Sequence, residues 1–160
     1  MRYLLLSAML VFVSTARAAE HPQWASLAAL HGQQKDSEEV VAFVQAHKLD
    51  EVTKGPSGSF TPDDNAYSLM YRDNRINWIV IQASPVPKKY AAANWLPYSK
   101  ALPGGLSPKD GRKDVVKKLG KPTKPDDNRW NHRGLLIWVM FNKEKTAIRE
   151  LFVSVQKKST

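Results

Sequence analysis

Cysteine is absent from this chain of 160 residues. Its absence excludes disulfides, cysteine-bound metal sites, thiol catalysis and the cysteine-linked lipid of bacterial lipoproteins. A long apolar stretch is also lacking, because the main apolar run extends only from Tyr3 to Val13 and a transmembrane helix needs roughly 20 apolar residues. We therefore expect a fold that is held by a hydrophobic core alone, which a chain of this length can build.

Motifs that carry catalysis are missing as well. The serines occur in no Gly-x-Ser-x-Gly sequence, and the four histidines form no His-x-His pair. The acidic pairs Asp63-Asp64 and Asp126-Asp127 each stand between Pro and Asn, which favours turns over catalysis. A hydrolase that uses these pairs stays an alternative. We expect a protein that is not an enzyme and that has no cofactor and no metal.

The amino-terminal segment is typical of a secretory signal peptide. A positive start at Met1-Arg2 precedes the apolar run, and Ala16-Arg17-Ala18 fits the small-x-small pattern at which such signals are cleaved. We expect residues 1–18 to be removed, leaving one domain over residues 19–160 in the periplasm or outside the cell, not inserted in a membrane. An uncleaved anchor is the alternative. Cleavage after Ala18 would create the terminus Ala19-Glu20-His21, which could enclose Cu(II).

Acidic residues are few, since 24 Lys and Arg stand against 15 Asp and Glu, for a net charge of +9. Such a balance often indicates nucleic-acid binding, but export argues against that partner. The positive field is better matched to an acidic protein, or to an anionic polymer of the cell envelope.

Helix and strand patterns alternate along the rest of the chain. One helix is predicted to start at Asp36, with Glu39 as the acidic residue three positions on. A second is predicted to start at Ser107-Pro108 and to end at Gly120. Strands are predicted at four places: residues 67–71, 76–82, 135–141 and 148–156.

The second half of the chain repeats the order of the first. Pro62-Asp63-Asp64-Asn65 returns as Pro125-Asp126-Asp127-Asn128, and the apolar spacing from Ile76 to Ile81 returns from Ile148 to Val153. We infer an internal duplication, with repeat 1 over residues 36–82, a connection over 83–106 that packs along the domain, and repeat 2 over 107–156. The expected fold class is α+β, with duplicated helix–β-hairpin units forming a four-stranded antiparallel sheet and the helices on one face.

This arrangement resembles the tandem α-β-β proteins of the beta-lactamase-inhibitor-protein type and the α-β-β units of small outer-membrane assembly lipoproteins. The segments that carry the resemblance lie in the second half: Leu102-Pro-Gly-Gly-Leu106, Ser107-x-x-Asp110, Asp114-Val115-Val116 and Leu119-Gly120-x-Pro122. The chain departs from these families in having no cysteine pairs. The resemblance implies an exported inhibitor or immunity protein that blocks a hydrolase or a toxin.

Strand alternation assigns the side chains to two faces. The face expected under the helices carries Tyr67, Leu69, Tyr71, Asn77, Ile79, Ile81, Leu135, Ile137, Val139, Phe141, Leu151, Val153 and Val155. The other face carries Ser68, Met70, Trp78, Val80, Gln82, Leu136, Trp138, Met140, Glu150, Phe152 and Ser154. A solvent-facing side of an antiparallel sheet is usually polar, so this second set is either covered, by residues 24–30 or 90–98, or open as a binding surface.

Eight residues are predicted to contact a partner. Trp78, Trp138, Met140 and Phe152 supply the apolar surface, Phe60 the tip of the loop from Gly55, and Arg72, Arg75 and Arg149 a cationic rim that is joined by Lys143 and Lys145. A second basic cluster, Arg112, Lys113, Lys117 and Lys118, is either a solvated helix face or an anion-binding site.

The function expected from these patterns is the binding and inhibition of an acidic protein. The alternative is an envelope accessory protein that binds an anionic polymer through the basic helix.

Overall fold

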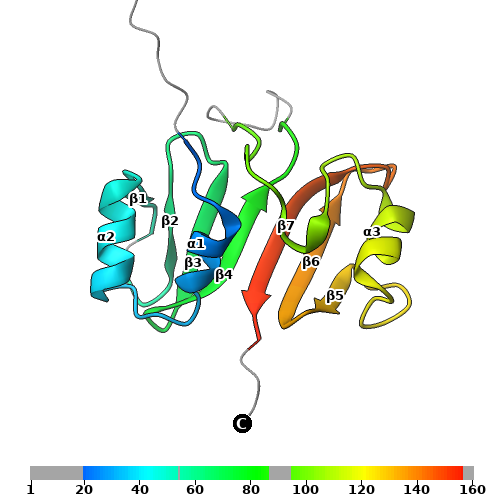
Figure 1. Ribbon diagram of the computed structural model, residues 1–160. Helices are drawn as coiled ribbons and strands as arrows, with labels where there is room; N and C mark the ends of the chain where they lie inside the picture. The colour runs from blue at the N-terminus through cyan, green and yellow to red at the C-terminus, as the bar shows by residue number, and fades with distance from the viewer. Residues whose placement is uncertain (1–19, 54, 87–94, 157–160) are drawn as a thin grey trace, which may run out of the picture.

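The computed structural model describes residues 20–53, 55–86 and 95–156 (Figure 1). They form an α+β structure in which helices pack on one antiparallel sheet. The predicted signal peptide lies outside the described residues. Within the described residues, none of the helices combines the length and the apolar character that crossing a membrane requires.

The described strands form a single sheet. They are β1 (Asp50–Glu51), β2 (Gly58–Thr61), β3 (Tyr67–Arg72), β4 (Arg75–Gln82), β5 (Arg129–His132), β6 (Leu135–Phe141) and β7 (Ile148–Val155). Their order is β1-β2-β3-β4-β7-β6-β5, and each neighbouring pair is antiparallel. The long hairpins β3–β4 and β6–β7 therefore meet along β4 and β7 at the centre (Figure 1).

Seven strands replace the four that the sequence predicts, although the four predicted strands are all present. β1, β2 and β5 have two to four residues each and contain glycine or polar side chains. Such short segments show no alternation that could be recognised from sequence. The two Pro-Asp-Asp-Asn segments also occupy different places, because the first joins β2 to β3 and the second joins α3 (Arg112–Leu119) to β5. They are therefore not equivalent parts of a repeat.

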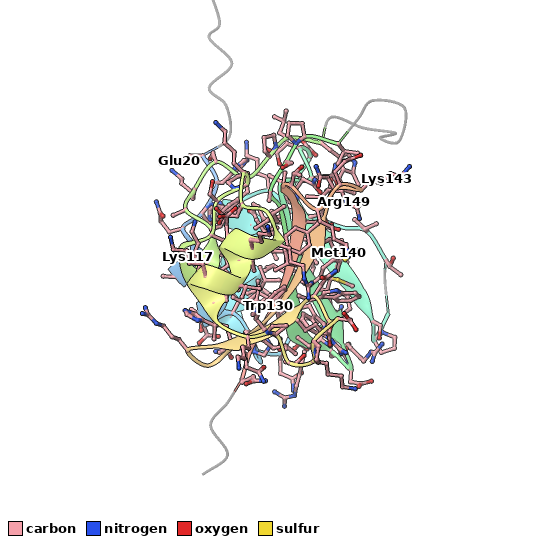
Figure 2. All side chains as sticks on the ribbon, turned by 90° about the vertical axis from the view of Figure 1, so that its right-hand side faces the viewer. Glu20, Lys117, Trp130, Met140, Lys143 and Arg149 are labelled. Carbon is pink, nitrogen blue, oxygen red and sulfur yellow. The ribbon has the colours of Figure 1, made fainter. Side chains whose placement is uncertain are left out.

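The helices lie on one face of the sheet. Figures 1 and 2 place α1 (Trp24–Ala29), α2 (Glu38–Ala46), the 3₁₀ turn η2 (Pro103–Gly105) and α3 on the same side of the strands. α2 is capped by the Ser37 hydroxyl, which accepts from the Val40 amide, one residue after the predicted Asp36.

α3 starts later than predicted. The Asp114 carboxylate accepts from the Gly111 amide, so the helix begins at Arg112 and not at Ser107. Ser107 to Asp110 forms a turn of its own, closed by the Ser107 amide donating to the Asp110 carboxylate at 2.7 Å.

The core lies between the helices and the sheet. Leu27, Val40, Val115 and Leu119 from the helices meet a buried row on the strands: Leu69, Ile79, Ile81, Ile137, Val139, Leu151 and Val153. The predicted face is confirmed for these strand residues. Trp130 on β5 is fully buried as well, and its indole donates to the Gly120 carbonyl. The sequence does not reveal this core residue, because β5 is too short to show an alternating pattern.

Each long hairpin carries a β-bulge at the corresponding position. In β3–β4 the register shifts between Met70 and Tyr71, which leaves Asn77 unpaired between Ile76 and Trp78. In β6–β7 it shifts between Met140 and Phe141, which leaves Arg149 unpaired between Ile148 and Glu150. The prediction that Asn77 faces the core is therefore wrong, because the bulge gives that place to Ile76, which is fully buried.

Candidate functional site

The sheet face opposite the helices is apolar at its centre. Met70 on β3 and Trp138 on β6 expose 37% and 39% of their surfaces, and Trp78 and Phe152 lie half-buried between them. Figure 2 shows Met140 and Arg149 on the side away from α3. We call this surface the groove face, because three adjoining hollows extend across it.

The hollows share lining residues and so form one continuous groove. The first, of about 500 Å³, is lined by Met70, Trp78, Trp138, Phe152 and Arg72, with Ser57 to Ser59 as a wall. The second, of about 280 Å³, shares Met70 and Phe152 with the first. The third, of about 750 Å³, shares Gln82, Trp95 and Glu150 with the second.

Two aromatic residues from neighbouring strands form the floor of the first hollow. Trp138 and Phe152 are directly opposite each other in the register of β6 and β7, and their ring centres lie 5.2 Å apart. Trp78 lies opposite Met70 on β3. The sequence analysis predicted that Trp78, Trp138 and Phe152 share a face, and the structure places all three in this hollow. Met140 lies half-buried on the same face.

The wall of the first hollow is held by Tyr71. Its hydroxyl donates to the Thr53 carbonyl and to the Glu51 carboxylate, at 2.6 Å for the latter. β2 approaches closely here, because a Cβ on Gly58 would lie 2.2 Å from the Thr53 carbonyl oxygen. Glycine is therefore required at position 58, and the loop that begins at Gly55 serves as a wall.

Phe60 does not form an exposed tip on this loop. It lies on β2 with 7% of its surface exposed and packs against Tyr71 at 5.3 Å between ring centres. The prediction that Phe60 contacts a partner is wrong, because its place in the strand turns its ring into the core.

The cationic rim is partly as predicted. Arg72 lines the first hollow, and Lys143 and Arg149 line the third. The bulge at Arg149 accounts for its position, because an extra residue in a strand re-aims its side chain. Arg75 donates to the Gly32 carbonyl at 3.1 Å and lines none of the three hollows.

Glu150 is the carboxylate of the groove. It lies half-buried on β7 between its cross-strand neighbours Met140 and Gln82, and it lines both the second and the third hollow. Burial raises the pKa of this carboxyl group above its usual range, although the charge of Arg149 acts in the opposite direction.

Of the two segments that could cover this face, α1 does not, and residues 90–98 are described only from Trp95 onward. α1 lies on the opposite side of the sheet (Figure 1). Tyr98 is buried, and its ring stacks on His21 with 5.6 Å between centres. Trp95 exposes 37% of its surface and forms a wall of the second and third hollows. Tyr90 lies outside the described residues.

The second basic cluster is largely engaged within the fold. Arg112 donates to Asn128 and to the Pro125 carbonyl, and its guanidinium lies 5.6 Å from the centre of the Trp130 ring. Lys118 forms an ion pair with Asp110 at 2.7 Å. Lys113 and Lys117 are exposed. The predicted anion site is therefore reduced to two lysines whose placement resembles an ordinary solvated helix face.

A histidine–carboxylate pair that the sequence did not suggest lies apart from the groove. His21 Nε2 lies 2.8 Å from Asp64, and its Nδ1 accepts from the Ser99 amide at 2.9 Å. Both ring nitrogens are thus occupied, which leaves none for a substrate or for the copper site considered at Ala19-Glu20-His21. No group of three potential metal-binding side chains occurs in the described residues.

Comparison of the chain with protein-family models, with curated proteins and with solved structures finds no match.

Proposed function

We propose that this chain is an exported, non-enzymatic protein that binds another protein of net acidic charge through the groove face and thereby inhibits it. The resemblance of its second half to proteins of the beta-lactamase-inhibitor type favours a hydrolase or a toxin as the target. The observation that carries the proposal is the groove, in which three hollows run together across an apolar sheet face.

The groove is lined by residue types that are common in protein–protein interfaces. Trp, Met, Phe and Arg are enriched at the centre of interfaces, where a few aromatic residues supply most of the binding free energy. Trp138 and Met70 retain more than a third of their surfaces for a partner to bury. Apolar surface of this kind on a monomer commonly marks a binding site.

The rim gives the surface its charge preference. Arg72 lies at one end of the groove and Lys143 and Arg149 at the other. Together with the net charge of +9, they favour encounter with an acidic surface. The alternative polyanion site on α3 has weaker support, because Arg112 and Lys118 already bind groups of the fold.

The test begins with capture of the partner from the exported proteins of the producing organism, followed by titration with the purified partner. We expect a stoichiometric complex that weakens as salt is raised. Trp138→Ala and Trp78→Ala should each weaken it by about 30-fold, as for a truncated interface hot spot.

The matched control is Val41→Ala. Val41 exposes 40% of its surface on α2, on the opposite side of the molecule, so this variant should bind as the wild type does. Equal affinity of both tryptophan variants and the wild type, with folding confirmed by circular dichroism, would remove the groove face as the binding surface.

A further inference from the structure

We infer that the Glu150 end of the groove is a subsite for a cationic group, such as the ammonium of a lysine or the guanidinium of an arginine on the bound partner. This inference rests on the proposed function and assigns different chemistry to the two ends of the groove. The Trp78 end accepts an apolar group, and the Glu150 end accepts a positive charge.

The first observation is a partly buried carboxylate without a hydrogen-bond donor. Glu150 lies half-buried on β7, and no described residue donates a hydrogen bond to its carboxylate or forms an ion pair with it within 4 Å. Its neighbour Gln82 directs its amide nitrogen to the carbonyls of Ser84 and Arg149. Burial of a carboxylate without a partner is costly, so a cationic ligand at this place would be stabilised by meeting it.

The second observation is the correspondence of the two hairpins. Trp78 and Glu150 each follow the bulged residue of their hairpin and lie opposite Met70 and Met140, respectively. Because β4 and β7 are antiparallel, these two positions lie at opposite ends of the groove. One of these two corresponding positions carries an aromatic ring, and the other carries a carboxylate.

The surroundings of Glu150 suit a cation. Trp95 lines the second and third hollows with Glu150, and Phe152 lines the second. Aromatic faces attract ammonium and guanidinium groups. Their combination with a carboxylate provides both an ion pair and a ring contact. The adjoining hollow of about 750 Å³ has room for a long side chain.

Arg149 and Lys143 also line the third hollow and could attract an anion there instead. Both are exposed, whereas Glu150 is half-buried. Exposed charges are screened by water and salt. We therefore assign the interior of the hollow to the carboxylate and the rim to the cations.

The experiment uses two small probes on the purified protein. N-acetyl-lysine methylamide represents a basic side chain, and N-acetyl-glutamate methylamide represents an acidic one. We expect the lysine probe to shift the Trp95 indole resonance and to lower the pKa of Glu150 in NMR titrations. The glutamate probe should bind about tenfold more weakly at this place.

Two variants make the result decisive. Glu150→Gln keeps the size of the side chain and should weaken the lysine probe about tenfold. Arg149→Gln removes the cation whose charge acts on Glu150 and should strengthen binding of the lysine probe. Three results would each overturn the inference. The first two are equal affinity of the lysine probe for Glu150→Gln and for the wild type, and tighter binding of the glutamate probe than of the lysine probe. The third is a pKa of Glu150 in the free protein that is already below the usual value, because the chain would then supply its own cation. A failure here leaves the proposed function standing, because that function is tested by Trp78 and Trp138.

Discussion

Asp64 holds the residues that precede α1 against the rest of the fold. One carboxylate oxygen accepts from the Ala66 amide at 3.1 Å, and the other lies 2.8 Å from His21 Nε2. Since His21 Nδ1 accepts from the Ser99 amide, its proton lies on Nε2 and points at Asp64. The residues that precede α1 are tied in this way to the β2–β3 turn and to the segment that follows Trp95.

Replacement of this carboxylate by an amide should be destabilising. In Asp64→Asn, one of the two acceptors becomes an amide nitrogen that faces another donor. We expect the free energy of unfolding to fall by about 1–3 kcal/mol in urea denaturation. Asp63→Asn is the matched control, since Asp63 is the exposed neighbour. Equal stability of the two variants would contradict the pairing of His21 with Asp64.

Tyr98 gives a prediction for alkaline pH. Its hydroxyl donates to the Pro22 carbonyl, and burial raises its pKa to about 12, compared with about 10 in an unfolded chain. Between these values the unfolded chain releases the proton and the folded chain retains it. Stability is therefore intact below pH ~10 and falls, by about 1.4 kcal/mol per pH unit for this group, as pH rises toward ~12.

Tyr98→Phe removes this titration and retains the ring. The variant should lose about 1 kcal/mol at neutral pH with the hydrogen bond, and its stability should decline less steeply than that of the wild type above pH ~10. Parallel pH profiles of the two proteins in denaturation experiments would show that Tyr98 titrates as it does in the unfolded chain.

At the scale of the element, the strands of the two long hairpins separate core from groove by alternation. Ile137 and Trp138 are neighbours on β6, yet Ile137 is fully buried and Trp138 exposes 39% of its surface. The same alternation in β3, β4 and β7 makes the groove face a continuous surface. Binding and folding should therefore be separable by substitution at adjacent positions.

Ile137→Ala and Trp138→Ala test this separation. The first leaves a cavity in the core and should cost about 2–5 kcal/mol of unfolding free energy. The second should cost less than half of that, although it removes the larger side chain, because Trp138 is partly solvated and contacts Phe152 alone among the aromatic rings described. A larger loss for Trp138→Ala would mean that the groove face belongs to the core.

At the scale of the whole molecule, one sheet and one core join the two halves. β4 pairs with β7 from Ile79–Val153 to Gln82–Glu150, and the buried cluster includes residues of both halves, such as Leu27, Val40, Val115 and Leu119. This continuity fixes the distance between the Trp78 and Glu150 ends of the groove. A ligand long enough to span the groove would therefore contact both ends at once.

The continuous core predicts one unfolding transition. Tryptophan fluorescence and far-ultraviolet circular dichroism should follow the same denaturation curve, and the calorimetric and van't Hoff enthalpies should agree. Val153→Ala, at the seam of β4 and β7, should shift that single transition without dividing it. Two resolved transitions would indicate that the halves fold as separate units.

Sequence periodicity predicted which side chains of the four long strands share a face, except at the bulge that contains Asn77. This was possible because side chains alternate between the two faces of a strand, so burial of one face places apolar residues at every second position. The helices around residues 38–46 and 112–119 were recognised from their stripes in the same way, although the start of α3 was misplaced by competing turn residues at Ser107 and Asp110.

The strand order, the short strands and the shape of the groove depend on contacts between segments that are distant in the chain. β2 and β5 are strands because they pair with neighbours already in place, and Phe60 and Trp130 are buried for the same reason. The bulges at Asn77 and Arg149, and the contacts that occupy Arg75, Arg112 and Lys118, depend on groups far away in the chain. Local periodicity contains no information about such distant partners, and their positions decide which aromatic and charged residues remain exposed on the groove face.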